Sequence, residues 1–222
     1  MRLWIVPVCF SILAIVVTNS AFLISISAGY VDSCLPYLDG CTSISRAARH
    51  GLGAILFKLT ILPVMTLLLV YWIISYMNLV GLSDCRTFKL QTMLIAGIFG
   101  SLFGMLYTAF LGSEGDIYRF LRRIGVYIFF LGTYSAQVIE VLELRSRSLH
   151  DSISVRLRKW VMIINAATIF VAGPYFLFLT DDDWMENVLE WNISLLLFLY
   201  FILSGLYWRE IDLSIELGRK NP

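Results

Sequence analysis

Residues 3–27 read LWIVPVCFSILAIVVTNSAFLISIS, an apolar run without a charged side chain. A helix rises about 1.5 Å per residue, so this run is long enough to cross roughly 30 Å of hydrocarbon. The alternative is a cleaved signal peptide, which fits the basic Arg2 before the run and the small residues at its end. The apolar core of a signal peptide spans only about 7 to 15 residues, so we expect a first membrane-spanning helix.

The rest of the chain has the same character. Of its 222 residues 59% are hydrophobic and 15% are charged, against about 45–50% and 25% in soluble domains. Six spans of about 20 residues consume nearly this entire apolar inventory. We therefore expect an all-α polytopic membrane protein, one six-span domain over residues 1–222, whose further spans lie near 52–80, 90–112, 124–143, 160–180 and 188–207.

The net charge of +1 gives no global field that would attract a polyanion, so nucleic-acid binding is excluded. The local distribution of Lys and Arg predicts the orientation, because cytoplasmic loops carry the excess. The predicted spans divide the Lys and Arg residues of the loops and termini into two groups, one on each side of the membrane. The smaller, external group consists of Arg46, Arg49, Arg119, Arg122 and Arg123. The larger group predicts an N-in, C-in topology and consists of Arg2, Arg86, Lys89, Arg145, Arg147, Arg156, Arg158, Lys159, Arg209, Arg219 and Lys220. A secretory-pathway membrane fits a eukaryotic host, and the inner membrane fits a bacterial one.

Two cysteines, Cys34 and Cys41, fall together in the first external loop. A disulfide between them suits the oxidising side of a membrane, and two free thiols are the alternative. The only nearby histidine is His50, whereas a structural zinc site needs four ligands. We expect neither a metal nor a cofactor.

Ionisable groups at membrane depth are few, and each calls for a partner or a function. Lys58 lies about two turns into the second span, and Glu190 lies in the first turn of the last span. The two side chains either form a pair, belong to a ligand site, or serve separately. In the last case Lys58 reaches the outer headgroups and Glu190 favours the positive end of a helix dipole.

The external loops carry organised charge. Arg46, Arg49 and His50 end the first loop, and an acidic run that includes Asp183 precedes the last span. These charges either neutralise each other in solvent or hold a ligand. In the second interpretation the basic groups, together with the arginines at 119–123, bind a lipid phosphate. The carboxylates then hold a counter-group or act as acid and base.

Other polar and small residues fall inside the predicted spans. Thr133, Gln137 and Glu140 share one helix face, which indicates either interhelical hydrogen bonds or a water-filled vestibule. Gly97, together with the GxxxG pair formed by Gly100 and Gly104, predicts that the third span packs closely against its neighbours.

The longest cytoplasmic loop is strongly basic. Its charges attract either anionic inner-leaflet lipid or a protein partner, although a positive-inside signal alone explains them equally well. They are Arg145, Arg147, Arg156, Arg158 and Lys159.

The sequence contains no GxSxG, HExxH, phosphate-binding loop or dinucleotide fingerprint. The sequence therefore does not decide whether the protein is an enzyme, although the absence of these motifs favours a non-enzymatic role. Lipid acyl transfer or hydrolysis is the expected reaction class if the protein is an enzyme.

A family resemblance adds to this reading. The SISAG run at residues 25–29 leads into the first loop, and the last span opens with Leu189, Glu190 and Trp191 and leaves through Trp208. With six spans and short loops, the chain resembles the FRAG/DRAM/SFK family of membrane proteins, above all its GPI-lipid-remodelling branch. The resemblance implies a role in handling a GPI-, ceramide- or phospholipid-like lipid, but it carries over no catalytic residues.

We therefore expect a protein that binds or helps to remodel a membrane lipid through an external-leaflet pocket between the first, second and last spans. The alternatives are a small transporter or channel that uses Lys58 and Glu140, and a non-catalytic scaffold that recruits a partner through its basic loop. The expected lipid-binding residues are Arg46, Arg49, His50, Lys58, Asp183 and Glu190.

Overall fold

The computed structural model describes residues 2–82, 87–146, 152–178 and 183–213. In these ranges the regular secondary structure is helical, which confirms the all-α part of the expected fold class. Two helices are short, α2 (Pro36–Asp39) and α3 (Ile44–Ala47). The long ones are α1 (Ile5–Ser27), α4 (Gly51–Gly81), α5 (Phe88–Phe110), α6 (Asp116–Ser146), α7 (Ile153–Phe178) and α8 (Trp184–Glu210).

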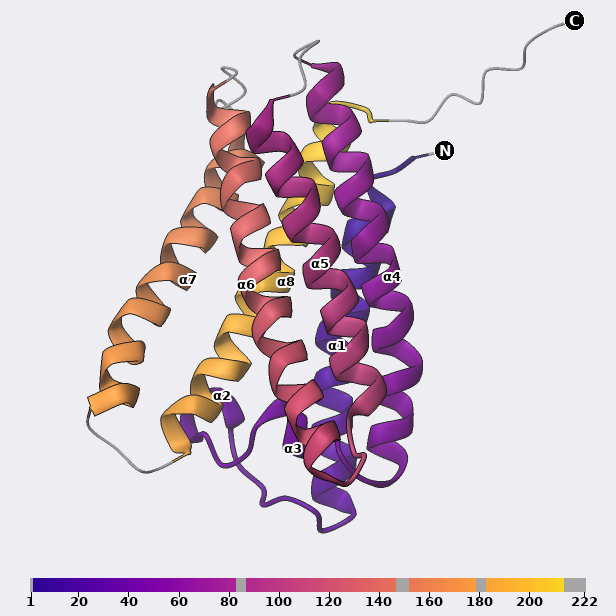
Figure 1. The fold of residues 1–222 in the computed structure, drawn as a ribbon, viewed down its shortest axis with the longest axis vertical. Helices are drawn as coiled ribbons and strands as arrows, with labels where there is room; N and C mark the ends of the chain where they lie inside the picture. Colours follow the sequence, from indigo (N-terminus) through magenta and orange to yellow (C-terminus); the bar gives the residue numbers. More distant parts are fainter. Residues whose placement is uncertain (1, 83–86, 147–151, 179–182, 214–222) are drawn as a thin grey trace, which may run out of the picture.

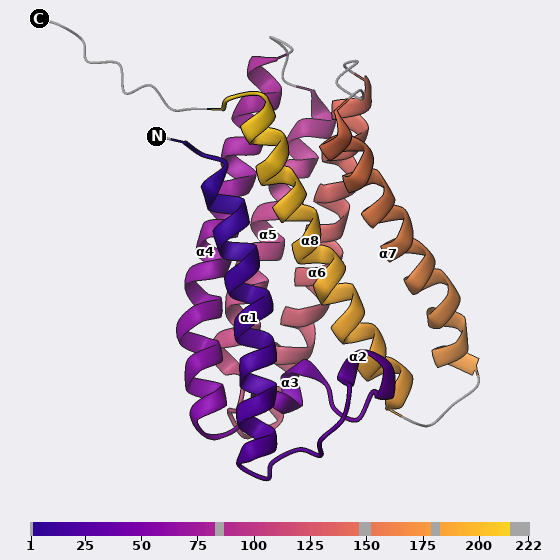
Figure 2. The same ribbon diagram turned by 180° about the vertical axis from the view of Figure 1, so that it is seen from behind.

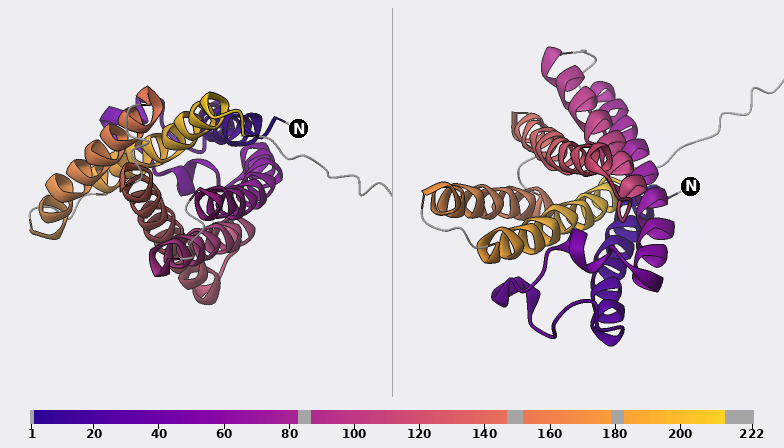
Figure 3. Two further views of the ribbon diagram at one scale, coloured as in Figure 1. Left: turned by 90° about the horizontal axis from the view of Figure 1, so that it is seen from above. Right: turned by 60° about the horizontal axis from the view of Figure 1, so that its bottom comes forward.

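The long helices form an up-and-down bundle (Figures 1 and 2). The start of α1 and the end of α8 meet at one end, where the Leu3 backbone N–H donates to the Leu213 carbonyl at 3.4 Å. We call this the terminal end. At the opposite end α2 and α3 lie in the connection from α1 to α4, and we call it the disulfide end. In Figure 3, α7 lies against α8 at the edge of the bundle.

Among the described helices, α1, α4, α5, α6 and α8 are long and apolar enough to cross a membrane. This finding fits an integral multi-pass membrane protein. Some helices also extend beyond the predicted spans, most clearly α6, which begins at Asp116 rather than near residue 124. An aspartate in the first turn favours the positive end of the helix dipole. As a consequence, Arg119, Arg122 and Arg123 lie on α6 and not in the loop where the sequence placed them.

Small residues set the distance between α5 and its neighbours, as the sequence predicts. A Cβ added at Gly97 would lie 2.4 Å from the Trp72 indole of α4, and one at Gly100 would lie 2.7 Å from Thr133 Oγ1 of α6. Gly104 faces Met65 of α4 at a similarly short distance. Lipid supplies no hydrophobic drive between helices, so this close backbone approach is a main source of their association.

The close contact between α5 and α6 predicts the effect of adding a single methyl group. A Cβ at Gly132 of α6 would lie 2.8 Å from the Ala96 carbonyl oxygen and 3.2 Å from Gly100 Cα. Gly132→Ala should therefore force α5 and α6 apart and destabilise the protein by about 1–3 kcal/mol, measured by thermal unfolding in detergent. The control is Gly81→Ala, because a Cβ there meets nothing within 4 Å. Equal unfolding temperatures for both variants would contradict the packing argument.

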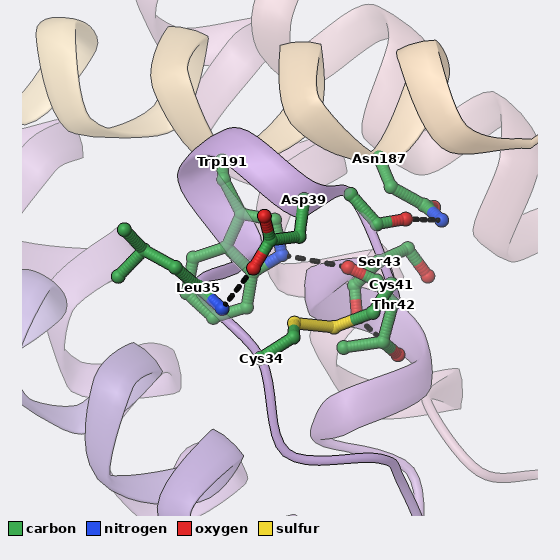
Figure 4. Close-up of a disulfide and its surroundings, with 9 residues drawn as sticks. Cys34, Leu35, Asp39, Cys41, Thr42, Ser43, Asn187 and Trp191 are labelled. Atoms are coloured by element: carbon green, nitrogen blue, oxygen red, sulfur yellow. Dashed lines mark hydrogen bonds between the residues drawn. A yellow bond between two sulfur atoms is a disulfide. The ribbon is translucent and has the colours of Figure 1, made fainter.

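The connection between α1 and α4 folds back over the start of α8 (Figure 4). The predicted disulfide between Cys34 and Cys41 is present and closes this connection on itself. The Trp191 indole N–H donates to the Thr42 carbonyl at 2.8 Å, and the Asn187 amide donates to the Gly40 carbonyl at 2.8 Å. These bonds are buried, so they hold the short helices in place over α8.

Candidate functional site

A cavity of about 560 Å³ lies between α6, α7 and α8, in the half of the bundle nearer the disulfide end. Its walls are mainly apolar side chains from these three helices. Two wall residues, Tyr127 and Leu131 of α6, are 60% and 70% exposed. Since they belong to a candidate membrane span, the cavity reaches the surface that would face lipid. The other apolar wall residues are Val126, Phe130, Ile169, Leu189, Ile193 and Leu197.

In the described part of the chain, the bonds between α6 and α7 lie near the terminal end, and the cavity lies beyond them. There, Glu140 pairs with Arg158, and the Tyr134 hydroxyl donates to the Met162 carbonyl at 3.1 Å. Towards the disulfide end α7 leans away from α6 and follows α8 (Figure 1).

Arginines gather at the disulfide end of the cavity. Arg49 comes from the turn after α3, and Arg119, Arg122 and Arg123 come from the first turns of α6. Arg122 Nη1 donates to the carbonyls of Phe110 at 3.3 Å and Ser113 at 2.5 Å, which orients its guanidinium.

Arg49 is partly buried. Its Nε is buried and has no hydrogen-bond partner in the described part of the chain. Burial, followed by the positive charges of Arg122 and Arg46, lowers the pKa of Arg49. An arginine starts so far above neutrality that it stays protonated. Arg49 therefore presents a fixed and incompletely solvated positive charge, which an anion would stabilise.

Two carboxylates lie on the α8 side of the same cavity. Glu186 and Glu190 are four residues apart, so they share one helix face. Glu190 Oε1 accepts a hydrogen bond from the Ser45 backbone N–H at 3.3 Å. In the described ranges neither carboxylate forms an ion pair with an arginine of the cavity.

A polar atom without a partner lies deeper in the wall. Asn165 of α7 is only 1% exposed and lines the cavity, and its Oδ1 has no hydrogen-bond partner among the described residues. A buried acceptor in this state costs about 1–3 kcal/mol. The sequence shows this residue only as a polar side chain in an apolar helix, and nothing local in the sequence reveals that it faces a cavity.

The residues expected to bind lipid do not gather in one place. Arg49 and Glu190 line the cavity, whereas Arg46 Nη2 pairs with Asp183 Oδ2 at 3.1 Å on the exposed surface. His50 is exposed beside the Tyr30 ring at the start of α4. The remaining acidic residues of that run, 181 and 182, lie outside the described residues.

The pair considered between Lys58 and Glu190 is not formed, and Lys58 lines neither described cavity. A hollow does lie between α1, α4 and α8, where the sequence placed the pocket, but it measures only about 60 Å³. That volume holds a few waters at most. The space large enough for an organic ligand is displaced towards α6 and α7.

A second polar centre lies nearer the terminal end and is fully buried. Glu140 Oε2 pairs with Arg158 Nη2 at 2.6 Å. The hydroxyls of Tyr71 at 2.9 Å, Ser75 at 2.6 Å and Tyr200 at 2.7 Å also donate to this carboxylate. The centre therefore connects α4, α6, α7 and α8. On this face of α6, Gln137 and Glu140 form interhelical hydrogen bonds, whereas the buried Thr133 Oγ1 has no partner among the described residues.

This centre corrects one expectation about the basic loop. Arg158 is 0% exposed, so it is not available to inner-leaflet lipid or to a partner. Its guanidinium also lies 4.5 Å from the Tyr200 ring centroid, a cation–π contact. The structure leaves Arg145, Arg156 and Lys159 nearer solvent, while Arg147 lies outside the described residues.

The ion pair predicts a strong and coupled effect on stability. Glu140→Gln or Arg158→Met leaves one buried charge unpaired and should cost about 3–5 kcal/mol. The double variant should cost less than the sum of the two, which a double-mutant cycle on thermal unfolding measures. Arg156→Gln is the matched control, because Arg156 is exposed two residues away. A control that unfolds as early as Arg158→Met would contradict this role.

Comparison of the chain with protein-family models, curated proteins and solved structures finds no match.

Proposed function

We propose that the protein binds a membrane lipid in the cavity between α6, α7 and α8, with the lipid phosphate at the arginines. The observation that carries this proposal is that charged and apolar side chains occupy different parts of the same cavity. Four arginines lie at its disulfide end, and apolar walls lead from them to the exposed surface at Tyr127 and Leu131. A ligand that matches both parts is an amphiphile with an anionic group.

The dimensions support the same proposal. Ligand cavities in proteins typically measure about 300–1,000 Å³, and this one measures about 560 Å³. It has room for a headgroup and the first part of its chains. The rest of each chain would lie along α6 and α7 in the bilayer. The family resemblance implies lipid remodelling, and binding is the part of that role that the cavity supports.

The proposal predicts which charges matter. Arg119→Gln with Arg123→Gln removes two exposed arginines from the cavity and should reduce co-purifying phospholipid at least tenfold, since hydrogen bonds to charged groups contribute about 1.5–3 kcal/mol each. Native mass spectrometry of the detergent-purified protein measures the bound lipid. Lys58→Gln removes a positive charge outside the cavity and should leave binding unchanged.

A cavity-filling variant tests the walls separately. Ile193→Trp places a large ring in the hollow and should exclude lipid chains while leaving the arginines in place. Thermal unfolding confirms that each variant is folded. A wild-type protein that carries no lipid, or an equal loss with Lys58→Gln, would overturn the proposed site.

We also propose that α7 is a sixth span and that the disulfide end faces outward, with both termini inside. The 26 residues of α7 exceed the roughly 20 that a span needs. A disulfide between Cys34 and Cys41 fits an oxidising compartment.

Cysteine labelling tests this orientation. In a variant that keeps only Cys34, a membrane-impermeant maleimide should label intact cells. A cysteine added after Pro222 in a cysteine-free background should be labelled only after permeabilisation. The reverse pattern would refute the proposed topology.

A further inference from the structure

The cavity carries both signs of charge on opposite walls. The arginines come from α6 and from the turn after α3, whereas Glu186 and Glu190 come from α8. Within the described ranges they form no ion pair across the hollow. Both groups of charges line one hollow that opens to the surface, with Arg119, Arg123 and Glu186 at its exposed rim.

Glu186 and Glu190 have oxygen atoms that can accept further hydrogen bonds. Each carboxyl group has two oxygens that can accept hydrogen bonds. Oε1 of Glu190 accepts from the Ser45 N–H, and Glu186, one turn earlier, is exposed. The pair therefore offers free acceptors to a group that donates several hydrogen bonds and carries positive charge.

Two further atoms independently indicate that a ligand belongs here. The Arg49 Nε is buried at the basic end without a partner, and the Asn165 Oδ1 is buried in the wall without one. Both are polar atoms of the cavity lining that the described chain leaves unsatisfied. A ligand that fills the cavity can meet both, the first with a phosphate oxygen and the second with a polar group of its backbone.

We infer that the ligand has a zwitterionic headgroup of the phosphoethanolamine type, with its phosphate on the arginines and its primary ammonium on Glu186 and Glu190. This inference rests on the proposed function and specifies its substrate class. An anionic glycerol headgroup leaves the carboxylates facing a ligand of like charge. A quaternary ammonium has no N–H to donate to the two carboxyl groups.

The test is a competition assay on the purified full-length protein. A fluorescent dioleoyl phosphatidylethanolamine is bound in detergent micelles and displaced by unlabelled dioleoyl phosphatidylethanolamine, phosphatidylglycerol or phosphatidylcholine. The ethanolamine lipid should compete about tenfold better than either of the others, as expected for one to two charge-assisted bonds. Soluble glycerophosphoethanolamine should compete poorly, because it lacks the chains that the apolar walls bind.

Two acidic variants localise the selectivity. Glu186→Gln with Glu190→Gln should abolish the preference and improve competition by phosphatidylglycerol. The single Glu186→Gln, which leaves the bond from Glu190 to Ser45 intact, should reduce the preference several-fold. Glu114→Gln is the matched control, since Glu114 is an exposed carboxylate near the same end that does not line the cavity.

The outcomes separate this inference from the proposed function. If phosphatidylglycerol or phosphatidylcholine competes as well as the ethanolamine lipid, or if both acidic variants keep the preference, the headgroup assignment is wrong although lipid binding stands. If glycerophosphoethanolamine competes equally, the ligand is a soluble headgroup and not a lipid. If the fluorescent lipid does not bind and no phospholipid co-purifies, the proposed function itself fails.

Discussion

The ion pair between Glu140 and Arg158 is the contact on which the rest of the arrangement depends. A buried charge is costly unless it is paired, and each of these two groups is the partner that the other requires. Their contact, with the hydroxyls of Tyr71, Ser75 and Tyr200, joins α4, α6, α7 and α8 at one depth. It fixes α7 to the bundle near the terminal end, and α7 is free to lean away from α6 beyond that point.

The disulfide end is held by a different set of forces. Its short helices are anchored to α8 by buried hydrogen bonds from Trp191 and Asn187 and are closed by the disulfide. This arrangement places Arg49 and Ser45 at the edge of the cavity, against the start of α6 and α8. The basic end of the site is thus assembled from segments distant in the sequence, and its geometry depends on the folded connection between α1 and α4.

Features that depend on local pattern could be predicted from the sequence. Apolar runs predicted the helices, and the spacing of Gly97, Gly100 and Gly104 predicted a close helix contact. The closeness of Cys34 and Cys41 in the sequence predicted the disulfide. Positions that depend on helix rotation and on distant partners could not be predicted. A count of basic residues treats Arg158 as a surface charge, although its place on α7 turns it towards Glu140. Lys58 and Glu190 have suitable depth for a pair, but depth does not determine which faces of two helices meet.

The position of the cavity follows from the same distinction. A pocket between the first, second and last spans was the natural expectation, because their polar residues lie at matching depths. Close packing fills that region, however, and leaves only about 60 Å³. The larger space arises where two helices joined by a buried charge pair diverge. A hollow formed in this way has a polar end set by the anchored loops and a side that reaches the lipid-facing surface. An amphiphile can therefore leave its chains in the bilayer while its headgroup occupies the charged end, without exposing apolar surface to water.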